Sequence, residues 1–258
     1  MNFLRQYKKY GSIPSSHDFI KFFALIIMII DHIGHYFFPE QLAWRAVGRI
    51  GFPVWFFLSG YAKKSDEFPK ELFIFAVLLV LVDLLFKFPL LSVNALFTII
   101  FCRYFVHSIV KERTSDKSLL IWVVMLIIYY YPSALLFEYG SLALLFALWG
   151  YIYRNNPKSR QSLVMGITSC VLFIATQFIE YSFSWYENLI MISGTIFVIV
   201  LLQNFKTSFY EKLEGNFFAK IGMFFGRNTL YMYFIHICLF VVLSYFMYIE
   251  KHQEFSWF

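Results

Sequence analysis

Charged residues are scarce in this chain. They make up only 15% of its 258 residues, whereas a soluble domain carries roughly a quarter. Apolar residues make up 60%, and they fall in runs long enough to cross a hydrocarbon core about 30 Å thick. The composition therefore excludes an ordinary soluble fold and indicates an integral membrane protein.

Cysteine is also rare, since the chain has only three. Cys102 and Cys170 lie inside apolar runs, without the CxxC or His-Cys spacing of a metal site. We therefore expect small buried side chains and no disulfide. The net charge is +6, but the Lys and Arg residues are dispersed and form no basic face, which argues against nucleic-acid binding.

A cleavable signal peptide is not evident, because the first seventeen residues are too polar to contain its apolar core. We expect 1–17 to be a cytoplasmic N-terminal segment, followed by helices that cross the membrane. Nine apolar segments are candidate spans, at 18–38, 45–62, 70–88, 94–110, 119–132, 139–153, 161–180, 188–204 and 228–249. Residues 205–227 alternate charged and aromatic positions, which predicts an amphipathic helix at the interface.

The distribution of positive charge predicts the orientation. Most of the 22 Lys and Arg residues fall in segments that share one side of the membrane if the N-terminus is cytoplasmic. The sequence thus predicts an all-α, polytopic membrane helical bundle of about nine transmembrane helices, with residues 1–258 forming a single domain. No internal repeat is visible, which argues against a transporter built from inverted repeats.

Ionisable side chains inside the apolar runs are candidate functional residues, because such groups are costly in a membrane unless they have a partner or face a polar cavity. Those in this chain are Lys21, Asp31, His32, His35, Arg49, Asp83, Arg103, His107 and His236. Lys21 and His32 are eleven residues apart on the first span, or about 16 Å along a helix. His32 and His35, and likewise Asp31 and His35, have the spacing of one helix face.

This set suits acid–base chemistry beside a phosphate group. A histidine acts as a general base near neutral pH, and a carboxylate such as Asp31 can orient it. Lysine and arginine suit a phosphate-bearing co-substrate. A structural role stays open, with Asp31 paired to Arg49 or Arg103 between helices. A metal site from His32, His35 and Asp31 has weak support, because no ligand from a second helix is evident.

Three separated motifs resemble the membrane acyltransferase-3 superfamily. They are Asp18, Lys21 and His32 within DFIKFFALIIMIIDH, the segment GRIGFPVWFFLSGY at 48–61, and GRNTLYMYFIH at 226–236. Within that superfamily the chain is most similar to the TraX family, through MIIDHIGHYFFP, GRIGFPVW, NALFTIIF at 94–101 and FEYGSLALLFALWGY at 137–151.

The resemblance implies an acetyltransferase in a prokaryotic inner or plasma membrane. The acetyl group would move from cytoplasmic acetyl-CoA, a co-substrate, to an acceptor at the outer side, either a pilin-like N-terminal amine or a hydroxyl of a glycan or lipid. In that picture His32 is the base, Asp31 orients a histidine, and His35 belongs to the same catalytic group. Lys21, with Arg49 or Arg103, contacts CoA.

The position of Arg49 leaves two roles open. It falls near the outer end of its span, so direct contact with CoA requires a break at Pro53; a re-entering span would let Arg49 stabilise the acyl oxyanion instead. Ser59 is a conceivable nucleophile, but direct transfer is simpler because no His-Asp pair is placed beside it.

Two other functions compete with the enzyme. A transporter or channel would use the intramembrane charges to line its path. A scaffold that holds pilin-like helices would use them only as structural partners. Membrane lipid is a partner in every case.

Overall fold

The computed structural model describes residues 11–63, 68–86, 93–109 and 116–250. Every regular element in these ranges is a helix, and the two β-type pairings are isolated bridges. Four helices are long and apolar enough to cross a membrane: α2 (Ser16–Phe37), α10 (Arg160–Glu180), α11 (Trp185–Gln203) and α13 (Thr229–Glu250). The prediction of a helical membrane protein is confirmed at this level.

The middle of the chain forms shorter helices. These are α5 (Lys70–Leu85), α6 (Ala95–Ile109), α7 (Asp116–Ile128), α8 (Tyr130–Ala134) and α9 (Gly140–Asn155). The expected span at 119–132 is thus two helices. Pro132 lies in the first turn of α8, where its missing N–H cannot continue the hydrogen bonds of α7. Residues 1–10 of the expected N-terminal segment, and the expected span ends at 88 and 110, lie outside the described residues.

The expected span at 45–62 is also broken. It consists of α3 (Leu42–Gly48), a 3₁₀ turn η1 (Arg49–Gly51) and α4 (Phe52–Tyr61). Pro53 lies in the first turn of α4, a position that suits proline because no helical N–H partner is needed there. The break therefore falls just before Pro53 and places Arg49 at the junction of the two helices.

The expected amphipathic helix over 205–227 is shorter than predicted. Only α12 (Phe217–Arg227) is an α-helix, with Asn216 as its N-cap. The preceding residues contain the short turn η3 (Glu211–Leu213) and end at Gly215, whose φ of 82° interrupts a helix. Phe217 and Phe218 are exposed, whereas Ala219 and Gly222 are buried; the placement of this helix at the membrane interface stays a prediction.

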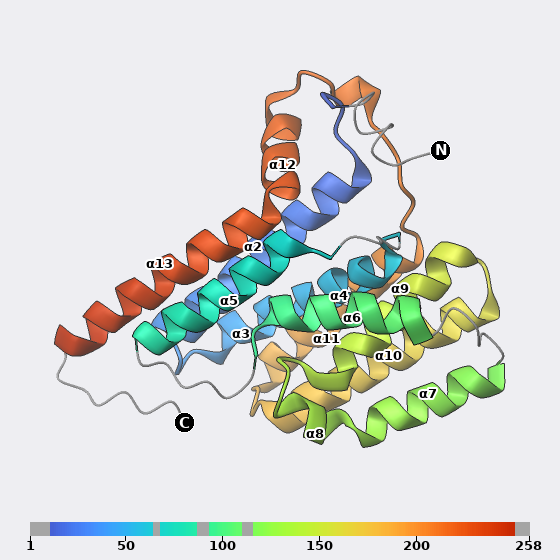
Figure 1. Cartoon of the computed structure of the whole chain (residues 1–258), viewed down its shortest axis with the longest axis horizontal. Helices are drawn as coiled ribbons and strands as arrows, with labels where there is room; N and C mark the ends of the chain where they lie inside the picture. Colours follow the sequence, from blue (N-terminus) through green and yellow to red (C-terminus); the bar gives the residue numbers. More distant parts are fainter. Residues whose placement is uncertain (1–10, 64–67, 87–92, 110–115, 251–258) are drawn as a thin grey trace.

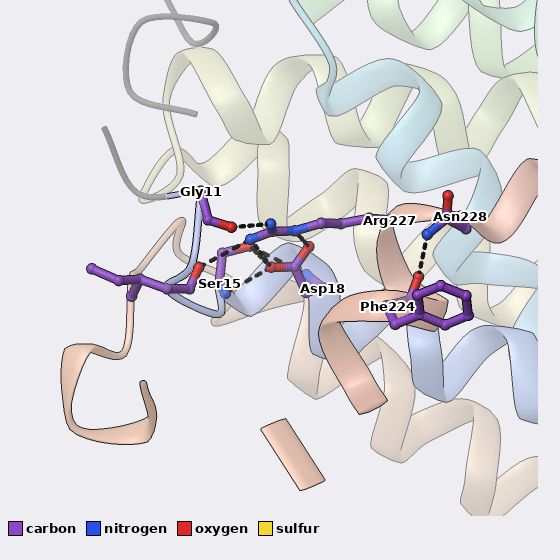
Figure 2. Close-up of polar contacts among 7 residues, drawn as sticks. Gly11, Ser15, Asp18, Phe224, Arg227 and Asn228 are labelled. Carbon is purple, nitrogen blue, oxygen red and sulfur yellow. Dashed lines mark hydrogen bonds and ion pairs between the residues drawn. The ribbon is translucent and has the colours of Figure 1, made fainter. Parts of the chain in front are cut away.

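An ion pair attaches α12 to the first turn of α2 (Figure 2). Arg227 contacts the Asp18 carboxylate at 3.3 Å and donates to the backbone carbonyls of Gly11 and Ile13. Asp18 also accepts hydrogen bonds from the N–H and hydroxyl of Ser15, which caps α2. The same side chain therefore caps one helix and anchors another.

Helix α9 forms the centre of the larger half of the molecule, packed by α4, α6 and α10 (Figure 1). Its contact with α4 is a backbone contact. A Cβ on Gly60 would lie 1.7 Å from the carbonyl oxygen of Ala147, and one on Gly150 would lie 2.0 Å from that of Phe57. Small residues at these positions let the two helices approach closely, as is common between membrane helices.

Helices α2, α5 and α13 lie side by side in the other half (Figure 1). At one end of the bundle the start of α2 meets the ends of α4 and α9: His17 and Tyr61 both contact Thr207, and Arg154 donates to the carbonyl of Ala62. We call this the Tyr61 end. At the opposite Tyr181 end, the last turns of α2 and α10 meet α3, where Arg45 donates to Tyr181.

Candidate functional site

Two cavities lie between the halves of the molecule. The first, about 130 Å³, is lined mainly by apolar side chains such as Trp55, Leu72 and Leu230. The second, about 190 Å³, is more polar and extends toward the Tyr181 end, where Asp83 and Asn94 line it. Four residues line both cavities: Asp31, His32, Glu138 and Tyr233. Two of these four, Asp31 and His32, are residues for which the sequence predicted a catalytic role.

His32 stands at this junction, on α2. Its Nδ1 is 2.7 Å from Nε2 of His236 on α13, and the two rings stack with centroids 5.0 Å apart. His236 Nδ1 in turn lies 2.7 Å from the carbonyl oxygen of Met232. Nε2 of His32 has no hydrogen-bond partner among the described residues, so it is available to a molecule in either cavity.

Asp31 binds arginines rather than a histidine. Its carboxylate is 2.6 Å from Arg45 and 3.9 Å from Nε of Arg49. This contact needs a close approach of α2 and α3, because a Cβ on Gly48 would lie 2.2 Å from Cβ of Asp31. The structure therefore favours the pairing with Arg49 that the sequence left open, adds Arg45, and places no histidine ring on the carboxylate in the described part of the chain.

Two tyrosines fix Arg49. Its guanidinium lies 5.4 Å from the ring centre of Tyr139 and 5.0 Å from that of Tyr181, and it donates to the Tyr181 hydroxyl. Nε of Arg49 and Oδ1 of Asp31 are buried without a hydrogen-bond partner among the described residues. Arg49 lines the first cavity, so the positive charge of its guanidinium acts on a group bound there.

Acidic side chains dominate the second cavity. Asp83 and Glu138 line it without an ion pair in the described residues, and His35 lines it as well. Glu138 lies in the turn before α9. Burial raises the pKa of its carboxyl group, while the positive charge of Arg49 acts in the opposite direction.

Lys21 and Arg103 lie away from both cavities. They are within electrostatic reach of each other, nearer the Tyr61 end. The three residues predicted to contact CoA are therefore not brought together, since Arg49 stands with Asp31 at the cavity junction. His107, also near the Tyr61 end, contacts the carbonyl of Ala62.

Ser59 has no catalytic surroundings. It is buried, donates to the carbonyl of Phe56 at 2.7 Å, and lines neither cavity. The three cysteines are free. No group of three His, Cys, Asp or Glu side chains suited to a metal is found within the ranges that the structure describes.

The sequence did not single out several residues of this site. Arg45 stands at the first position of the expected span at 45–62 and Glu138 just before the expected span at 139–153, so neither lies in the interior of an apolar run. His236 was named, but nothing in its spacing indicated that it pairs with His32, 204 positions earlier. Nothing in the sequence distinguishes Tyr139 and Tyr181 from the other aromatic residues of the chain, which has 18 Tyr and 34 Phe.

Comparison with known proteins adds a family. The family model described as "TraX protein" matches residues 16–244. An uncharacterised protein of Rickettsia prowazekii (strain Madrid E) is 27% identical over 244 residues, which covers 91% of this chain and 93% of that protein. No solved structure matches.

Proposed function

Because this chain belongs to the TraX family, we propose that it is a membrane acetyltransferase, which moves an acetyl group from cytoplasmic acetyl-CoA to an acceptor at the outer side. The observation that carries the proposal is the position of His32 where an apolar cavity meets a polar one. A base at such a junction contacts the acyl donor on one side and the acceptor on the other.

The membrane topology in this proposal has nine spans and a cytoplasmic N-terminus. The broken segment α3–η1–α4 counts as one span, and so do α7 and α8 together. Lys63, Arg154 and Lys206 follow or end helices at the Tyr61 end, and the positive-inside rule favours the cytoplasm for such a cluster. The polar cavity then extends toward the outer side.

An epitope tag after Phe258 should be reached by antibody in intact bacterial cells, because nine spans put the C-terminus outside. Protection of the tag contradicts nine spans.

The chemical step is a direct transfer. His32 takes the proton of the acceptor's amine or hydroxyl, and the acceptor atom attacks the thioester carbonyl carbon. The carbon–sulfur bond breaks, the acetyl group stays on the acceptor, and the CoA thiolate leaves with the proton from His32. Arg49, which lines the first cavity, stabilises the oxyanion through its positive charge, and Asp31 holds Arg45 and Arg49 in position.

In this proposal, Lys21 and Arg103 act on the cytoplasmic side and His35 acts on the acceptor side. Lys21 and Arg103 contact the CoA phosphates from the Tyr61 end. The spacing of about 16 Å between Lys21 and His32 along α2 suits a donor whose pantetheine arm separates its phosphates from its thioester. His35 lines the acceptor cavity.

The test is transfer of radiolabelled acetyl from acetyl-CoA to a host membrane fraction by purified protein in nanodiscs. We expect His32→Ala to lower the rate by about 100-fold or more, because a general base contributes that much. His107→Gln is the matched control, since it alters a buried histidine outside both cavities and should keep the rate within about threefold.

Each alternative has its own outcome. Equal transfer by wild type and His32→Ala removes His32 from the mechanism. If folded wild-type protein transfers no acetyl but carries solute into liposomes, the two cavities form a transport path and the enzyme proposal is wrong.

A further inference from the structure

A backbone carbonyl fixes the position of a proton on His236. The Met232 carbonyl oxygen can only accept a hydrogen bond, and it lies 2.7 Å from Nδ1 of His236. Nδ1 of His236 therefore carries the proton. In a neutral imidazole the other nitrogen, Nε2, is then an acceptor.

This assignment passes to His32. Nε2 of His236 lies 2.7 Å from Nδ1 of His32, and an acceptor at that distance requires a donor opposite it. Nδ1 of His32 therefore carries the proton of the neutral ring. Its Nε2 keeps the lone pair, at the nitrogen that has no partner among the described residues.

Aromatic neighbours hold the two rings in this arrangement. His236 contacts Phe240 at 5.5 Å and Tyr233 at 5.7 Å between ring centres, and His32 contacts Tyr36 at 6.3 Å. Met232 and His236 are one helical turn apart on α13, so their hydrogen bond is local and does not depend on the approach of α2. The acceptor nitrogen of His236 is thus fixed by contacts within α13 alone.

No carboxylate competes for this role in the described part of the chain. Asp31, the residue beside His32, is occupied by Arg45, and Glu138 forms no hydrogen bond with either ring in the described residues. Asp83 lines the same cavity and forms no hydrogen bond with either ring among the described residues. The contact with His236 is therefore the interaction that selects the tautomer.

We propose that His236 is a positioning residue, which holds the proton on Nδ1 of His32 so that Nε2 faces the cavities as the base. The inference rests on the proposed function for the base role, but the proton assignment does not depend on it. In the transfer step, Nε2 takes the acceptor's proton and returns it to the CoA thiolate, while the proton on Nδ1 stays in the bond to His236.

The first test reads the tautomer directly. Protein labelled with ¹⁵N in its histidine rings is studied in nanodiscs by NMR, and the His32 signals are identified by their loss in His32→Gln. We expect hydrogen on Nδ1 of His32 and a lone pair on Nε2 in the wild type. The reverse assignment overturns the proposal, whatever the activity.

Two variants separate the tautomer from packing. The side-chain oxygen of His236→Gln can replace Nε2 as acceptor, whereas His236→Met fills similar space without an acceptor. We expect His236→Gln to keep the Nδ1–H tautomer and a kcat within about fivefold of wild type. His236→Met should mix the tautomers and lower kcat by about 10–100-fold, less than the loss of the base itself, with little change in KM for acetyl-CoA.

The outcomes distinguish the two proposals. Equal kcat losses in His236→Gln and His236→Met, with the His32 tautomer unchanged in both, assign His236 to packing and overturn the positioning role. If the predicted tautomer is found but wild-type protein transfers no acetyl group, the proposed function fails and the proton assignment remains.

Discussion

The contact between Asp31 and Arg45 offers a quantitative test of the site's construction. The two side chains are only 7% and 14% exposed, and their closest atoms are 2.6 Å apart. Removing one partner of a buried ion pair costs about 3–5 kcal/mol, because the remaining charge is left without compensation. We expect Asp31→Asn to lower the free energy of unfolding by an amount in that range.

A double-mutant cycle isolates the pair. Arg45→Gln alone removes a partner of Asp31 but leaves Arg49 near the carboxylate, at 3.9 Å, so its cost should be smaller, about 2–3 kcal/mol. The double variant should be more stable than the two single losses predict, by about 1–3 kcal/mol. The double variant does not recover the full stability of the wild type. Arg49 stays buried in it, and its neighbour is then a neutral amide instead of the Asp31 carboxylate.

Equilibrium unfolding in mixed detergent micelles, followed by circular dichroism, measures these free energies. The control cycle combines Asp31→Asn with Arg227→Gln, whose side chain is bound near the other end of α2. That pair should be additive within about 0.5 kcal/mol. A coupling between Asp31 and Arg45 as small as that of the control would refute the argument that this ion pair holds the site together.

Two further predictions concern the helix contacts. Gly60→Ala and Gly150→Ala should each lower the melting temperature by several degrees, because the added methyl group meets the backbone of the facing helix. Gly222→Ala is the control and should change the melting temperature little, because its methyl group meets phenylalanine rings at 3.1 Å or more. Equal shifts in all three variants would count against a backbone contact. Arg227→Gln should lower the free energy of local unfolding at the start of α2 by about 1–3 kcal/mol, because Asp18 loses a charged partner. Backbone hydrogen exchange in residues 11–18 should therefore become faster. Unchanged exchange would show that other contacts hold α12.

Long apolar runs predicted most of the long helices well. The segments at 18–38, 161–180, 188–204 and 228–249 differ from α2, α10, α11 and α13 by three residues or fewer at each end. Hydrophobic length determines such elements because a membrane-spanning backbone must satisfy its own hydrogen bonds. The same rule does not locate a break inside an apolar run, so hydrophobic length alone left the break at Pro53 as an open possibility, which the structure shows as the junction of α3, η1 and α4.

The sequence indicated which residues of α2 lie near one another, but it did not indicate all of their partners from other helices. Asp31, His32 and His35 were correctly placed near one another by helical periodicity, because that spacing is local. The partners of these residues come from distant elements, and no spacing rule reports which helices become neighbours. The structure therefore supplies Arg45 and the pairing of His236 with His32, and of the two roles left open for Asp31 it favours the partner of arginine.

The arrangement of the site also explains why a bundle of this size is needed around so few polar groups. His32 and Asp31 come from α2, Arg45 and Arg49 from α3 and the turn after it, Glu138 from the turn before α9, and His236 from α13. Each contact depends on a close approach of helices, and the glycine at 48 shows how little space remains between α2 and α3. A buried charge keeps its partner only while those helices stay packed. The apolar core therefore determines the electrostatics of the junction as directly as the charged residues do.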